Sequence, residues 1–79
     1  MTLEGLEPGR SAIITAIRWD GIADGDAKRL RALGFDAGVD ISVAHRGVFG
    51  GRDPLAVRLG RTTIALRRVH AMAISVEPA

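Results

Sequence analysis

The chain has no cysteine, no tyrosine and a single lysine, and only three of its 79 residues are aromatic. The lack of cysteine excludes disulfides and thiolate zinc sites. No apolar run approaches the roughly 20 residues that span a bilayer, and the first residues lack the basic and apolar regions of a secretory signal. We therefore expect one domain, residues 1–79, located in the cytoplasm.

The chain also has little excess of positive over negative charge. Eleven basic residues stand against nine acidic ones, which gives a formal net charge of +2. Binding of single-stranded nucleic acid needs a basic groove lined with stacking aromatic side chains, and this chain has few aromatics to supply. No nucleic-acid partner is therefore predicted, and a small basic nucleic-acid-binding barrel is kept only as an alternative.

The apolar residues that are present favour strands. Seven isoleucines and six valines stand beside seven leucines, and ten glycines indicate many turns. A single helical turn is expected over 67–71, before the last strand. Runs of β-branched or alternating apolar residues predict five short strands, over 12–17, 39–43, 55–59, 62–66 and 72–76.

The third and fourth of these strands form a hairpin. Gly60-Arg61 lies between them and suits a two-residue type II′ turn, which takes glycine at its first central position. A turn of this length fixes the register of the two strands. The expected cross-strand pairs are Leu59 with Thr62, Val57 with Ile64 and Leu55 with Leu66.

A short helix is predicted between the first two strands. Its side-chain cap is expected from Asp24 or Asp26. Gly34 ends the helix in the left-handed conformation, and Phe35 then contacts Leu30 in a Schellman ending. A helix of about two turns is not stable alone, so we expect it to dock on the sheet.

Several apolar side chains are expected to form the core. Ala27, Leu30 and Leu33 form an apolar stripe at three-residue spacing. Leu30, Leu33 and Phe35 are predicted to be buried because of the Schellman ending. Trp19 is interpreted as a lid over the core, with a binding platform as the alternative. Residues 1–10 form an N-terminal arm, and residues 11–77 form the barrel. The strand count and the single helix predict a mainly β fold, a small, strongly bent five-stranded barrel.

Four segments in combination resemble the FeoA family, small cytoplasmic proteins of bacterial ferrous iron uptake. The segments are Arg29–Val43, with the pattern RLxxLGFxxGxxIxV, Gly51–Leu55, Ala65–Arg68 and Met72–Val76. The resemblance implies an SH3-like barrel, a fold similar to the C-terminal domain of repressors of the diphtheria toxin repressor type. It also implies a partner, the ferrous iron permease, whose cytoplasmic part carries a GTPase domain. The family offers no catalytic residues to carry over.

The two histidines are the candidate metal ligands. His70 and His45 are 25 residues apart, with neither an HxxxH spacing nor an acidic pair beside them. The alternative interpretation is a histidine in a surface turn and a histidine at a strand end. No cofactor is required, and we expect any divalent metal to bind weakly, through His70 or His45 with an acidic residue of a neighbouring chain.

Three residues are candidates for partner binding. Arg67 and Arg68 are expected to point outward, where guanidinium groups would pair with carboxylates of a partner, or would simply be solvated. Phe49 lies in the glycine-rich loop 47–54 and is interpreted as an exposed anchor, or as a cap folded back on the barrel.

No histidine stands at a recognisable spacing from Ser11, Ser42 or Ser75, so the chain is not predicted to be an enzyme. The sequence and the resemblance together predict a cytoplasmic adaptor or regulator that binds the GTPase-containing region of the permease and modulates it. It would reach the membrane only through that partner, and weak homodimerisation is compatible with this role. A transition-metal-binding barrel is the second alternative.

Overall fold

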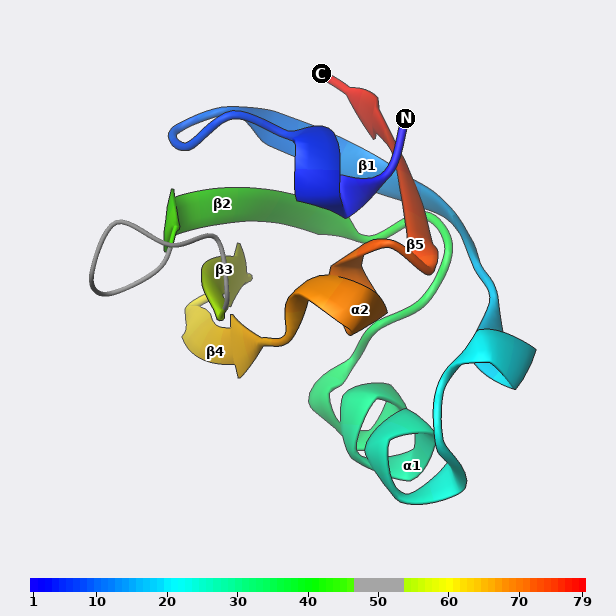
Figure 1. Cartoon of the computed structure of the whole chain (residues 1–79). Helices are drawn as coiled ribbons and strands as arrows, with labels where there is room; N and C mark the ends of the chain where they lie inside the picture. Colours follow the sequence, from blue (N-terminus) through cyan, green and yellow to red (C-terminus); the bar gives the residue numbers. More distant parts are fainter. Residues whose placement is uncertain (47–53) are drawn as a thin grey trace.

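A computed structural model describes residues 1–46 and 54–79 and shows five antiparallel strands curled around one core (Figure 1). The sheet has the order β4-β3-β2-β1-β5, so the mainly β class is confirmed. No helix within the described ranges is long and apolar enough to cross a membrane. The strands are β1 (Ser11–Ile17), β2 (Asp40–Arg46), β3 (Leu55–Leu59), β4 (Thr62–Leu66) and β5 (Ile74–Pro78), with helices η1 (Leu3–Gly5), η2 (Trp19–Gly21), α1 (Asp24–Leu33) and α2 (Arg68–Ala71).

The β3–β4 hairpin has the predicted register. Gly60 has a φ of 61°, and no non-glycine residue in the described ranges has a positive φ, as a type II′ turn at Gly60-Arg61 requires. All five residues of β3 face partners in β4 without a bulge. The cross-strand pairs include the three that were predicted, Leu59–Thr62, Val57–Ile64 and Leu55–Leu66.

The end of α1 is the predicted Schellman motif. Gly34 has a φ of 104°, and its N–H donates to the Arg31 carbonyl at 3.1 Å. The Phe35 N–H donates to the Leu30 carbonyl, also at 3.1 Å. Leu30 and Phe35 are both buried, so this ending fastens the helix to the core.

The prediction that Leu33 is buried was wrong, because its side chain is 38% exposed. Residues of a helix advance by about 100° each, so a stripe at three-residue spacing drifts by about 60° at every step. Ala27 and Leu30 still face the core, whereas Leu33 has rotated about 120° away from Ala27.

The predicted side-chain cap of α1 was also wrong. The residue at the cap position is Ala23, whose side chain makes no capping hydrogen bond. Asp24 and Asp26 lie inside the first turn instead. Their carboxylates there favour the helix through its dipole rather than through a capping hydrogen bond.

We expect Gly34→Ala to destabilise the fold by about 1–3 kcal/mol, because an alanine would have to hold a positive φ. The added Cβ would lie 3.5 Å from Cδ2 of Leu59, an ordinary contact, so the cost comes from the backbone and not from a clash. Gly25→Ala is the control: no atom lies near its added Cβ, and Gly25 has an ordinary helical backbone. Urea unfolding should show Gly25→Ala as neutral or stabilising, by up to about 1 kcal/mol.

The N-terminal segment is more than an arm. Leu3 and Leu6 are buried in the core. Thr2 forms a bridge with Ser75, and the Val76 N–H donates to the Met1 carbonyl at 2.8 Å. The first residues therefore pair with the outer edge of β5, which would otherwise be an open edge of the sheet.

The connection between the last two strands differs slightly from the prediction. The helical turn is present as α2, but the last strand begins at Ile74 and not at Met72. Met72 takes the C-cap position of α2, with helical backbone angles. Its side chain consequently points away from the sheet and is half exposed.

Candidate partner-binding face

The two predicted arginines lie at the corner between β4 and α2. Leu66 at the end of β4 is fully buried and fixes the position of this corner. Arg67 keeps an extended backbone, and its carbonyl accepts the N–H groups of His70 and Ala71 at 3.0 and 3.1 Å. Arg67 and Arg68 are both exposed, as predicted.

Arg68 connects α2 to the N-terminal segment. Its Nε lies 3.3 Å from Oε1 of Glu4, and the two side chains are 53% and 18% exposed. A surface ion pair of this kind contributes only about 0–1 kcal/mol. The contact therefore orients the guanidinium more than it stabilises the fold, and the half-exposed Arg68 side chain stays within reach of solvent.

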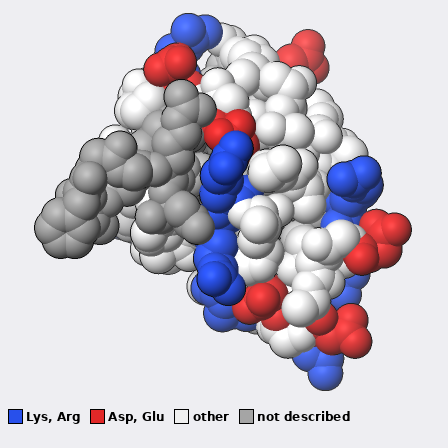
Figure 2. Space-filling model, viewed as in Figure 1, with Lys and Arg blue, Asp and Glu red and all other residues white. Residues whose placement is uncertain are grey.

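Two apolar side chains stand beside these arginines. Val69 and Met72 are 63% and 50% exposed. They are three residues apart on one helical turn and so share a side of it, while His70 and Ala71 face the core. Figure 2 shows a column of Lys and Arg side chains beside an uncharged area on the face of the molecule to which α2 belongs. We call Arg67, Arg68, Val69 and Met72 the α2 face.

Two residue types of the α2 face, methionine and arginine, are ones that protein interfaces favour. Methionine and arginine are enriched in the centres of such interfaces, whereas lysine and acidic residues are depleted there. Sequence reasoning missed Val69 and Met72, because Met72 was assigned to a strand. The predicted helical turn ended at residue 71, so no local pattern placed these two side chains on one side of it.

His70 does not lie on the surface, which corrects the interpretation as a surface-turn histidine. It is 5% exposed, and its Nε2 lies 3.4 Å from Oδ2 of Asp26. Its buried Nδ1 has no hydrogen-bond partner among the described residues. His45 is exposed on β2. Within residues 1–46 and 54–79, no group of three or more potential ligands could hold a metal ion.

The contact between His70 and Asp26 joins α2 to α1. We expect Asp26→Ala to lower the free energy of unfolding by about 1 kcal/mol, because it leaves the buried imidazole with neither nitrogen paired. The same change in a His70→Leu background should cost less, because no polar ring remains to be satisfied. Urea unfolding of the four proteins of this cycle measures the difference, and equal costs in both backgrounds would contradict this account.

Trp19 acts as the predicted lid. It is half-buried and packs against the core, and the Arg31 guanidinium lies 4.4 Å from the centre of its ring. Trp19 and Arg31 line a shallow hollow of about 490 Å³, together with Gly34, Phe35 and other residues. Because Arg31 already covers one face of the ring, this arrangement does not favour stacking of a nucleic-acid base.

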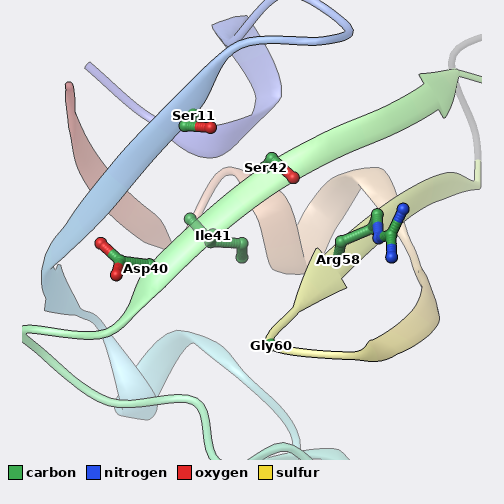
Figure 3. Close-up of a pocket in the computed structure, with 6 residues that line it drawn as sticks. All are labelled: Ser11, Asp40, Ile41, Ser42, Arg58 and Gly60. Atoms are coloured by element: carbon green, nitrogen blue, oxygen red, sulfur yellow. The ribbon is translucent and has the colours of Figure 1, made fainter.

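A second hollow, of about 450 Å³, lies on the outer face of β1, β2 and β3 (Figure 3). Its lining includes Ser11, Ser42 and Arg58, which follow one another across the three strands. The side chains of Asp40 and Arg58 lie at opposite sides of it and do not point toward one another. None of the described residues that line this hollow is a histidine.

The third predicted partner residue, Phe49, lies outside the described residues. Arg67 and Arg68 are neighbours on the α2 face, whereas His45 on β2 and His70 on α2 belong to separate elements. The metal-ligand and partner-binding assignments therefore remain predictions.

Comparison with known proteins places this geometry in a family. The model of the FeoA domain matches residues 1–78. FeoA of Stenotrophomonas maltophilia, a prokaryotic SH3 domain protein solved in complex with zinc, is 36% identical; the match covers 98% of this chain and 89% of that one, with a TM-score of 0.81. FeoA of Chlorobium tepidum is 27% identical over 99% of this chain and 70% of its own, with a TM-score of 0.83.

A protein with a different description, and with much lower sequence identity, shares the same fold. The manganese regulator SloR is 14% identical over all of this chain and 34% of its own, with a TM-score of 0.77, which shows a shared fold alone. Curated proteins gave no match. The SH3-like barrel and the association with ferrous iron transport, both expected from the resemblance, are confirmed, and the chain belongs to the FeoA family.

Proposed function

We propose that this chain is a cytoplasmic adaptor or regulator of ferrous iron uptake, which binds the GTPase-containing region of the ferrous iron permease and modulates it. The observation that carries the proposal is the match of the FeoA domain over residues 1–78. The description of the S. maltophilia relative, which names it a candidate ferrous iron transport activating factor, supports the same role.

The α2 face supports binding to a protein. An interface is usually dominated by a few buried anchors surrounded by contacts of lower energy. Val69 and Met72 supply apolar anchors, and Arg67 and Arg68 supply charge for carboxylates of the partner. None of these side chains fills the core, so the fold holds the face in place without depending on it.

The experiment is a calorimetric titration of this chain into the GTPase region of the permease, without nucleotide, with GDP and with a GTP analogue. We expect saturable binding in at least one state. The double variant Val69→Ser/Met72→Ser should weaken it about tenfold or more, corresponding to a loss of about 1.4 kcal/mol of binding free energy.

Ile13→Ser is the matched control. Ile13 is 41% exposed on β1, and its replacement removes apolar surface away from the α2 face. We expect this variant to bind like the unchanged chain. Equal weakening by both changes would refute the α2 face as the contact, and no binding in any nucleotide state would refute the adaptor role.

A divalent metal is the second candidate ligand, because the S. maltophilia relative was solved with zinc. We propose that no resident metal is required and that zinc binds weakly at exposed His45 with an acidic residue of a neighbouring chain. Burial of His70 makes it the poorer ligand. In a zinc titration, His45→Ala should abolish the weak binding and His70→Leu should leave it, whereas tight, stoichiometric binding would contradict this proposal.

A further inference from the structure

The two edge strands of the sheet, β5 and β4, differ in whether another part of the chain pairs with their outer side. The outer edge of β5 is covered by the first two residues of the chain, through the Thr2–Ser75 bridge and the bond from Val76 to Met1. Among residues 1–46 and 54–79, nothing pairs with the outer edge of β4: β4 pairs only with β3, and the backbone bonds of α2 stay within 67–73 or run to Arg18.

The hairpin register shows which groups this edge presents. In a two-residue hairpin the pair that closes the turn, Leu59–Thr62, is hydrogen-bonded, and bonded and non-bonded pairs then alternate. Thr63 and Ala65 fall in the non-bonded pairs. Their N–H and C=O groups therefore point away from β3, and within the described ranges no bond to either residue is found outside the hairpin.

β4 also lacks the usual protections of an edge strand. Natural edges are blunted by charged residues, by proline or by a bulge. β4 has the sequence TTIAL, with none of these residues, and all five of its pairs with β3 are in regular register. The side chains of Thr62, Thr63 and Ala65 are exposed.

We propose that the β4 edge binds an extended segment of the partner protein, which adds a sixth strand to the sheet and carries acidic residues at both of its ends. The inference rests on the proposed function and specifies how the partner is held. Strand addition supplies affinity through main-chain hydrogen bonds, here with Thr63 and Ala65. The segment is about 17 Å long, the length of five residues in a strand.

Charge identifies the occupant. Arg61 in the β3–β4 turn and Arg67 after β4 stand at the two ends of the strand, and both are exposed. A second copy of this chain pairing through β4 would place arginine against arginine. Arg61 would face Arg67 of the other copy in an antiparallel pair, and each arginine would face its own counterpart in a parallel pair. A partner segment with an acidic side chain at each end would instead place a carboxylate beside a guanidinium at both ends of β4.

The test follows amide hydrogen exchange by NMR in this chain, free and saturated with the GTPase region of the permease. In the free chain, the amides of Thr63 and Ala65 should exchange rapidly, and the amide of Ile64, which faces β3, should exchange slowly. On binding, the exchange of Thr63 and Ala65 should slow at least tenfold.

Ala65→Pro provides the mutational arm. Proline is tolerated on an edge strand where the N–H faces outward, so the variant should fold and should bind at least tenfold more weakly. Ala65→Ser keeps the N–H and should bind normally. If Ala65→Pro does not fold, Arg61→Glu replaces it. Its control is Arg10→Glu, at an exposed position just before β1, a strand that does not pair with β4.

The outcomes separate the two proposals. Binding that leaves the exchange of Thr63 and Ala65 unchanged overturns strand addition and leaves the adaptor role intact. Absence of binding in every nucleotide state overturns both. A third outcome is that these amides are protected in the free chain, lose that protection on dilution, and the chain sediments as a dimer. That result would overturn binding of a partner segment and show that a second copy of this chain occupies the β4 edge.

Discussion

Replacing Leu3 and Leu6 together with alanine is expected to leave the chain largely unfolded at 37 °C. Each side chain is buried, and loss of a buried leucine costs about 2–5 kcal/mol. Native domains are stable by about 0.05–0.15 kcal/mol per residue, so the combined loss is comparable with the whole stability of a chain of this size. Circular dichroism against temperature measures the result.

This prediction distinguishes a core element from an arm. An arm lying on the surface would tolerate both changes, with little effect on the melting temperature. Glu7→Ala is the control, because Glu7 lies in the same segment and is exposed. A double Leu3→Ala/Leu6→Ala variant that melts within a few degrees of the unchanged chain would show that the first residues do not complete the core.

Phe35→Ala is expected to lower the free energy of unfolding by about 3–5 kcal/mol. Phe35 is 2% exposed and is among the largest fully buried side chains. The Phe35 and Leu30 side chains belong to the same buried cluster, so the change leaves a cavity beside α1, while the backbone bond from residue 35 to Leu30 remains possible. Urea unfolding followed by tryptophan fluorescence is suitable, because Trp19 packs against the same core.

Leu33→Ala is the informative control for this experiment. Leu33 belongs to the same sequence pattern as Phe35 but is partly exposed. We expect a cost below about 1 kcal/mol, as for other replacements at the surface. Similar costs for the two variants would mean that α1 buries the whole of its apolar stripe, contrary to the structure.

Local sequence signals predicted the local structure well. The turn at Gly60-Arg61 fixed the hairpin register, and Gly34 followed by Phe35 fixed the end of α1. Both features depend on residues within a few positions of one another, and few residue types satisfy the backbone geometry they need. The prediction for Leu33 was wrong because the three-residue apolar spacing was carried one step too far along the helix. Each such step rotates the side chain by about 60° away from the core.

Features that join distant parts of the chain could not be predicted in this way. The pair Arg68–Glu4 spans 64 residues, and Met1 binds Val76 across 75. His70 is buried and its Nε2 contacts Asp26 of α1, a residue 44 positions away, and one helical turn is too short for any periodicity to show which face is inward. Val69 and Met72 come onto one side of α2 because the helical backbone continues to Met72, which the sequence had assigned to a strand.

The central claim is that this chain acts by holding a protein partner at the α2 face and the neighbouring β4 edge. The most direct measurement is an NMR titration of the labelled chain with the GTPase region of the ferrous iron permease, in each nucleotide state. The account predicts saturable shifts that cluster on 61–72, with α1 and β1 largely unchanged. Shifts that cluster instead on Trp19 and α1, or no shifts at several hundred micromolar partner, would contradict it.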